Sequence, residues 1–175
     1  TRGAIMPVLS KEEHVAFLSE RRVVMRIAVV RPDGSPLVTP LWYLYEDEAI
    51  YFTPRERSEW FACLRHDPRA ALCIDEQPLP YRKVMVEGVA ELLYDVGADA
   101  QWRDLYLRMA KQYVPSDDAE AYLRNTINER RGLFRIRLAD AKVRSWRLPL
   151  QDEAGEGIWH QRYYQDPKTE FDGRA

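Results

Sequence analysis

A tight turn between two short apolar segments limits the fold of this chain more than any other feature. Asp33-Gly34 separates residues 23–30, which are rich in β-branched side chains, from residues 37–45. Apolar runs this short favour strands, and Gly34 can adopt the positive φ that a hairpin turn requires. Further segments of the same character bring the expected strands to six, at 23–30, 37–45, 49–53, 70–75, 84–94 and 134–146.

Helical patterns are few, and most come late in the chain. Ser10 and Glu13 match a capping box, and apolar side chains at helical spacing follow it and recur in three later segments. These patterns predict helices at about 11–20, 59–65, 102–109 and 122–127. Helices do not follow every strand, which excludes a doubly wound parallel sheet and indicates a small antiparallel barrel.

Length and charge set broad limits on the class of protein. The 175 residues fit one domain, 1–175, with a core at about 10–146 and a C-terminal tail at 147–175. The net charge of -2 argues against nucleic-acid binding. Apolar stretches are far shorter than the ~20 residues of a membrane helix, and the first residues lack the apolar core of a secretion signal. We therefore expect a cytoplasmic protein that contacts no membrane.

Side-chain chemistry points away from unaided catalysis. The three histidines, His14, His66 and His160, are far apart and form no metal-ligand pair. Hydrolase, P-loop and Rossmann motifs are absent from the sequence. We predict no catalytic side chain and no metal site, so any catalysis must depend on a bound cofactor.

The segment 51–60 has the chemistry of a phosphate site. A strand there ends in hydroxyl and guanidinium groups just before a helix, where donors can converge on an anion: Thr53, Arg55, Arg57 and Ser58. The alternative is an exposed loop in which two neighbouring glutamates screen the arginines.

Several motifs resemble a known family when their order and intervals are taken together. They are Asp33-Gly34-x-Pro36, Val38 to Trp42, Tyr51-Phe-Thr53, Ser58, Leu64-Arg-x-Asp-Pro-Arg69 and Lys83 to Glu91. Over about 10–146 the chain resembles the pyridoxamine 5'-phosphate oxidase-like flavoproteins of the FMN-binding split barrel. The resemblance implies a six-stranded antiparallel split β-barrel of Greek-key type with peripheral helices, forming a homodimer that binds two flavins in clefts at the subunit interface.

The resemblance also implies roles for particular residues. Thr53 and Ser58 correspond to contacts of the flavin phosphate, and Lys83 to a polar group near the flavin N5 and O4 edge. The strand beside the isoalloxazine ring corresponds to Val38, Thr39, Pro40, Leu41 and Trp42.

One departure from the family signature concerns the phosphate. Where the family commonly has Ser-Arg-Lys, this chain has Ser58-Glu59-Trp60, so two cations are missing. Losing two charge-assisted hydrogen bonds costs ~3–6 kcal/mol. Arg55 and Arg57 can replace them from the loop, and Trp60 can either stack on a ring or fill the core.

These observations leave three hypotheses for function. The first is an FMN-dependent oxidoreductase acting on an unidentified small molecule, and pyridoxamine phosphate itself is a poor candidate. The alternatives are a deazaflavin-dependent reductase of the same fold and a non-catalytic flavin- or haem-binding protein.

Two features late in the chain have open roles. Residues 129–147 hold seven Lys or Arg, which can contact an anionic substrate or the acidic segment 152–156 of the same chain, or form a solvated or dimer-paired strand face. The tail is rich in aromatic residues, and we expect it to pack over the barrel or a partner subunit: Trp159, Tyr163 and Tyr164.

Overall fold

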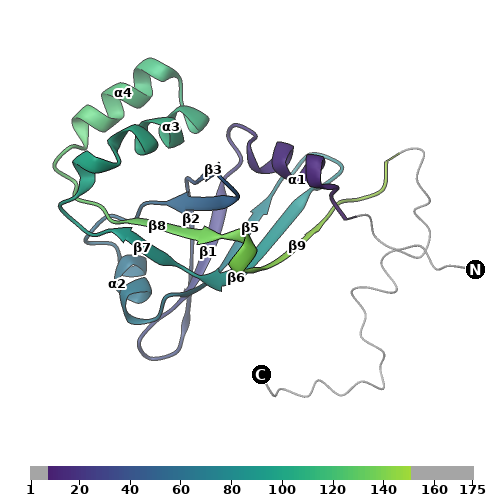
Figure 1. Cartoon of the computed structure of the whole chain (residues 1–175), viewed down its shortest axis with the longest axis horizontal. Helices are drawn as coiled ribbons and strands as arrows, with labels where there is room; N and C mark the ends of the chain where they lie inside the picture. Colours follow the sequence, from purple (N-terminus) through teal and green to yellow (C-terminus); the bar gives the residue numbers. More distant parts are fainter. Residues whose placement is uncertain (1–7, 151–175) are drawn as a thin grey trace, which may run out of the picture.

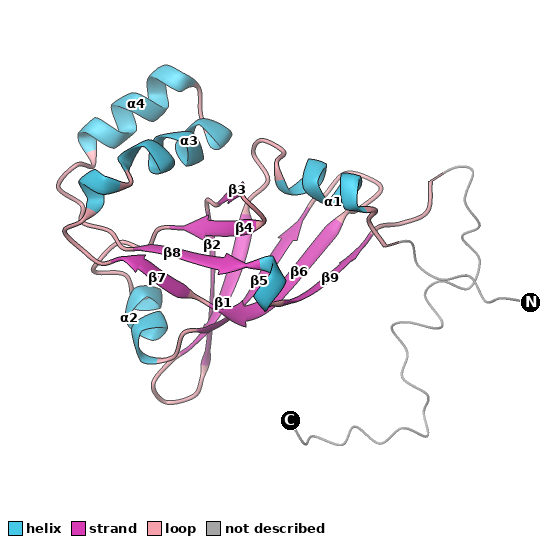
Figure 2. Cartoon of the chain, viewed as in Figure 1, coloured by secondary structure: helices cyan, strands magenta, loops and turns pink. Residues whose placement is uncertain are grey.

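The computed structural model describes residues 8–150, which form two antiparallel sheets with helices around them (Figures 1 and 2). The four helices are α1 (Lys11–Leu18), α2 (Glu59–His66), α3 (Arg103–Tyr113) and α4 (Ser116–Asn125), with 3-10 turns at Asp99–Gln101 and Leu138–Asp140. The nine strands are β1 (Met25–Val30), β2 (Pro36–Leu41), β3 (Leu44–Glu46), β4 (Ala49–Phe52), β5 (Arg69–Asp75), β6 (Lys83–Val89), β7 (Glu91–Tyr94), β8 (Leu133–Arg137) and β9 (Lys142–Trp146).

The nine strands replace the six that the sequence predicts, because three expected strands bend in the middle. Residues 37–45 divide into β2 and β3, residues 84–94 into β6 and β7, and residues 134–146 into β8 and β9. In each case one half joins the five-stranded sheet, of order β2-β1-β5-β6-β9, and the other half joins the four-stranded sheet, of order β3-β4-β8-β7. The chain therefore passes from one sheet to the other three times within what reads as a single strand.

Gly88 stands where two of these bent segments meet. A Cβ atom built on Gly88 would lie 3.1 Å from the Cβ of Ala141 and 3.1 Å from Cγ2 of Ile136. Ala141 follows the 3-10 turn that separates β8 from β9. The missing side chain of this glycine lets the β6 segment cross the β8–β9 segment.

A local sequence signal explains how α1 starts. The hydroxyl of Ser10 accepts from the Glu13 amide at 3.1 Å, and the Glu13 carboxylate accepts from the Ser10 amide at 2.8 Å, which confirms the capping box of α1. The two amphipathic patterns become α3 and α4, which pack side by side beyond one end of the sheets (Figure 1).

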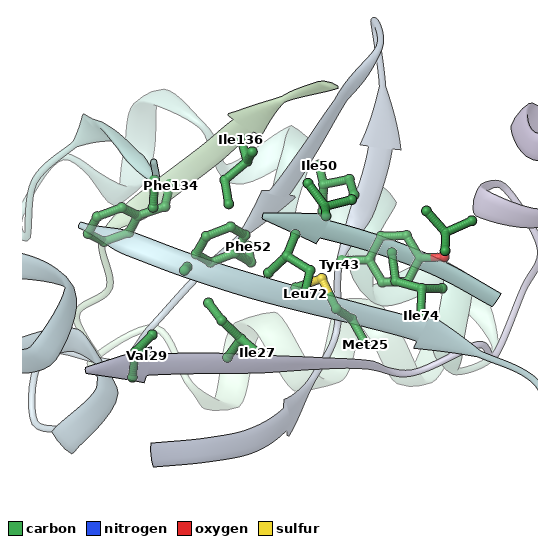
Figure 3. Packing of buried hydrophobic residues seen from close by; sticks show 14 of the residues in the cluster. Met25, Ile27, Val29, Tyr43, Ile50, Phe52, Leu72, Ile74, Phe134 and Ile136 are labelled. Carbon is green, nitrogen blue, oxygen red and sulfur yellow. The ribbon is translucent and has the colours of Figure 1, made fainter. Parts of the chain in front are cut away.

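The main core lies between the sheets (Figure 3). Phe52 and Phe134 are directly paired across β4 and β8, and their rings stack at 5.9 Å. The five-stranded sheet faces them with the fully buried side chains Met25, Ile27, Leu72 and Ile74. A second cluster joins the other face of the four-stranded sheet to α3 and α4, through Leu44, Tyr51, Leu133, Trp102, Tyr106, Met109 and Leu123.

The outward face of the five-stranded sheet is open by comparison. Val38 on β2 and Val89 on β6 are 65% and 61% exposed. Between them lies an apolar depression of about 490 Å³, lined by residues of β1, β2, β5 and β6. No helix within residues 8–150 is long and apolar enough to cross a membrane. The aromatic tail residues Trp159, Tyr163 and Tyr164 lie outside the described residues.

Candidate functional site

A cavity of about 310 Å³ lies where the end of β2, the connection from β4 to α2, and helices α3 and α4 come together. It gathers seven of the residues that the sequence predicts for cofactor binding: Pro40, Leu41, Trp42, Thr53, Arg55, Ser58 and Trp60. Four further residues complete its lining, namely Tyr106, Met109, Tyr122 and Arg131.

The aromatic wall of this cavity is built on Trp42, directly after β2. The Trp42 ring stacks on Tyr113 of α3, with centroids 5.0 Å apart and planes 3° from parallel, and tilts against Tyr122 of α4 at 5.4 Å. The Tyr113 hydroxyl accepts from the Tyr43 amide at 3.0 Å and donates to the Val23 carbonyl at 3.0 Å. Helix α3 therefore fixes the indole that lines the site.

The connection from β4 to α2 supplies the polar side of the cavity. Thr53 is buried, and the Ser58 hydroxyl donates to the Arg55 carbonyl at 2.7 Å instead of capping α2. Trp60 is half-buried, lines the cavity and packs against Phe52, with ring centroids 6.2 Å apart. Trp60 therefore packs against the core and also lines the cavity, and its stacking on a bound ring stays a prediction.

Arg131, which the sequence analysis did not assign to the site, is the most buried cation of the cavity. Its side chain is 8% exposed. Nη1 donates to the Thr53 carbonyl at 3.3 Å, Nη2 donates to the Tyr122 hydroxyl at 3.2 Å, and the guanidinium carbon lies 4.9 Å from the centre of the Tyr106 ring. Nε is buried and has no hydrogen-bond partner among the described residues.

The two tyrosines beside Arg131 have displaced pKa values. Burial raises the pKa of Tyr106. Burial also raises the pKa of Tyr122, but the hydrogen bond from Tyr106 and the charges of Arg131 and Arg55 outweigh it, so this pKa lies below its usual value. Displaced pKa values within a cavity are typical of functional sites.

Four predicted residues do not line the cavity. Val38 and Thr39 lie earlier on β2, and Arg57 is exposed in the loop before α2. Lys83 begins β6, which β1 and β5 separate from β2 in the sheet, and its Nζ lies 5.0 Å from the centre of the Trp146 ring. Within one chain, the structure does not bring Lys83 to the site.

The basic segment 129–147 is an ion-paired surface. Each of its seven cations has an acidic partner within 4.0 Å among the described residues: Arg130, Arg131, Arg135, Arg137, Lys142, Arg144 and Arg147. These ion pairs within the chain leave less unpaired positive charge on the strip than the sequence alone suggests, and pairing across a dimer stays a prediction. Arg131 differs from the other members in being buried inside the cavity.

Comparisons with known proteins place the chain in a family. A comparison with curated protein sequences finds no match. A conserved hypothetical protein of Mycobacterium tuberculosis has a similar structure, with 24% identity, a TM-score of 0.64, and coverage of 89% of this chain and 99% of that one. A FAD-binding protein of Mesorhizobium loti is 25% identical, with a TM-score of 0.57 over 80% of this chain and 97% of that one.

A third similar structure is an F420 reductase, at 24% identity and a TM-score of 0.51 over 71% of this chain and 93% of that one. Residues 10–145 match the sequence family described as pyridoxamine 5'-phosphate oxidase. This match spans far more than half of the 175 residues and includes all of the cavity. The chain therefore belongs to the pyridoxamine 5'-phosphate oxidase family.

Proposed function

We propose that this protein is an FMN-dependent oxidoreductase acting on a small molecule. The observation that carries the proposal is a single cavity that joins an aromatic and apolar wall, at Leu41, Trp42 and Trp60, to a hydroxyl- and arginine-rich end. A planar ring with a phosphorylated arm has the same division into an apolar and an anionic part. The FAD-binding and F420-reductase neighbours support a flavin or a deazaflavin as the ligand.

The residues present fit such a group. Thr53, Ser58 and Arg55 stand together at the polar end, and Arg131 adds a buried guanidinium whose Nε has no hydrogen-bond partner within residues 8–150. Arg55 and Arg131 thereby stand in for the two cations that the Ser58-Glu59-Trp60 segment lacks. In this proposal the phosphate faces these groups and the ring lies along the 38–42 segment.

When bound, the ring supplies hydride or electron transfer, which no side chain of the cavity can provide alone. The chain's own residues orient it and exclude water. Trp42 packs on Tyr113 and Tyr122, so contacts within the chain itself position the wall against which a ring packs. Preorganisation of this kind lowers the entropic cost of association.

The proposal includes a homodimer formed through the open face of the five-stranded sheet. Val38 and Val89 expose large apolar side chains there, beside the depression of about 490 Å³. Register places Lys83 on the same face as Val89, because alternate residues of β6 point to one side. A role for Lys83 at the edge of a bound ring therefore requires a second copy of the chain.

The test is a titration of the ligand-free protein with FMN and with the deazaflavin coenzyme, followed by flavin fluorescence and absorbance, with the oligomeric state measured by light scattering. We expect saturable binding and a dimer. Arg55→Gln should weaken binding by ~10-fold or more, since a charge-assisted hydrogen bond contributes ~1.5–3 kcal/mol. The matched control is Arg57→Gln, in the same loop but outside the cavity, which should leave affinity unchanged.

Tighter binding of the deazaflavin than of FMN would assign the reaction to deazaflavin chemistry. A haem absorption band in the purified protein, or a bound flavin that no reductant can reduce, would contradict the oxidoreductase proposal. Failure of both coenzymes to bind would overturn it.

A further inference from the structure

Arg55 and Arg131 lie opposite one another on paired chain segments. They form an antiparallel bridge that continues the β4–β8 ladder, flanked by hydrogen bonds from the Glu56 amide to the Arg130 carbonyl at 2.9 Å and from the Gly132 amide to the Pro54 carbonyl at 3.1 Å. Like charges directly opposite across a ladder repel one another. Two arginines in this position conflict with local stability, and such conflicts are typical of functional sites.

Both guanidinium groups converge on one oxygen. Nη2 of Arg55 lies 3.3 Å from the Tyr122 hydroxyl oxygen, and Nη2 of Arg131 lies 3.2 Å from the same atom. Two donors that reach a common oxygen are close enough to bind two oxygens of a single phosphate group. Guanidinium groups are well suited to this task because their donors form a rigid planar fork.

Arg131 retains an unused donor in a buried place. Its Nε has no partner among the described residues, although the side chain is 8% exposed. Leaving a buried charged donor without an acceptor is unfavourable. An anion bound beside the two guanidinium groups would relieve the repulsion between the two arginines and add favourable charge near this buried donor.

Glu129 partly neutralises the charge of the two arginines. Its Oε2 forms an ion pair with Nε of Arg55 and lies 3.7 Å from Nη2 of Arg131. Within residues 8–150, no other acidic residue forms an ion pair with either arginine. One half-exposed carboxylate thus faces two guanidinium groups, and the cluster keeps a net charge of about +1 toward the cavity.

We propose that Arg55 and Arg131 together form the subsite for the phosphate group of the bound coenzyme, and that Glu129 competes with that phosphate for the same guanidinium groups. This inference rests on the proposed function. It adds a second, buried cation from outside the loop before α2, and it assigns Glu129 as a residue that limits affinity.

The experiment measures the binding of inorganic phosphate by calorimetry, and of FMN and riboflavin by fluorescence, for the wild-type chain and its variants. Riboflavin carries the same ring without the phosphate, so the ratio of the two affinities isolates the subsite. Arg131→Gln should weaken FMN by about 10- to 100-fold and leave riboflavin unchanged. Arg131→Lys, which keeps the charge, should recover part of the loss.

Glu129→Gln should do the opposite and tighten phosphate and FMN by about two- to fivefold, because it removes an exposed competing charge. The matched control is Glu56→Gln. The Glu56 carboxylate pairs with Arg130 at 3.8 Å across the same two segments and, within residues 8–150, forms no ion pair with Arg55 or Arg131. It should change none of the three affinities. Circular dichroism shows whether each variant is folded. If Arg131→Gln does not fold, Glu129→Gln still tests the inference.

The outcomes separate the inference from the proposed function. Equal effects of Glu129→Gln and Glu56→Gln, or an FMN-to-riboflavin ratio that Arg131→Gln leaves unchanged, would overturn the inference while the flavin proposal stands. Phosphate binding that responds to these variants without any flavin or deazaflavin binding would overturn the proposed function and support the anion subsite.

Discussion

Replacing Gly88 by alanine tests whether the crossing of the bent strands is as tight as it looks. The new Cβ would lie 3.1 Å from two atoms, the Ala141 Cβ, which is fixed to the backbone, and the Cγ2 of Ile136, which is buried. Overpacking of this kind costs ~1–3 kcal/mol, whereas a Gly-to-Ala change gains ~0.4–1 kcal/mol by restricting the unfolded chain. We therefore expect Gly88→Ala to lower the free energy of unfolding by about 1–2 kcal/mol.

Urea unfolding followed by tryptophan fluorescence measures this change, with a constant m-value as evidence that only stability has altered. The matched variant is Gly88→Ala combined with Ala141→Gly, which removes one of the two contacts. A double-mutant cycle should show a favourable coupling of at least ~0.5 kcal/mol between the two sites. Unchanged or higher stability of Gly88→Ala, together with zero coupling, would show that a Cβ atom fits at this crossing without strain.

Three further predictions concern single contacts. Tyr113→Phe leaves the Tyr43 amide without its acceptor and should cost ~1–3 kcal/mol of unfolding free energy in urea; a loss below a few tenths would contradict the hydrogen-bond assignment. Ser10→Ala removes the Ser10 hydroxyl from the capping box with Glu13 and should lower the free energy of unfolding by ~1 kcal/mol. A thermal unfolding curve, followed by helical circular dichroism, that is the same as or more stable than that of wild type would refute it. Burial lowers the pKa of His14 in the folded chain, so the unfolded chain binds this proton more tightly. The folded state is therefore most favoured above ~pH 6.5, and its stability falls as the pH drops below that value. His14→Gln should have a flatter pH dependence of the urea midpoint between pH 7 and 5 than wild type.

Most of the secondary structure follows from local sequence patterns. The Asp33-Gly34 turn joins β1 to β2 with Gly34 at a φ of 84°, and the apolar repeats of the late segments form α3 and α4. The sequence pattern did not divide these long segments between two sheets, because alternation indicates which side chains are buried and not which sheet a strand joins. The bends depend instead on distant contacts, such as the one between Gly88 and Ala141.

The candidate site could likewise be predicted from the sequence only in part. Seven predicted residues come together because Pro40 to Trp42 and Thr53 to Trp60 lie at the ends of neighbouring segments, where the family resemblance placed them. Arg131 escaped notice since its only sequence signal is membership of a basic stretch that is otherwise ion-paired on the surface. Its pairing with Arg55 joins residues far apart in the chain and is visible only once β4 and β8 are aligned.

The passage of the chain between the sheets has a consequence for the dynamics of the protein. Since β2 and β3, β6 and β7, and β8 and β9 are each adjacent along the chain but divided between the sheets, neither sheet can open fully without disturbing the other. Amide hydrogens in the centre of both sheets should then exchange with solvent only through one common, global opening. Helices α3 and α4, which the chain inserts between β7 and β8, lie outside this shared unit and can fluctuate separately while the strands stay closed.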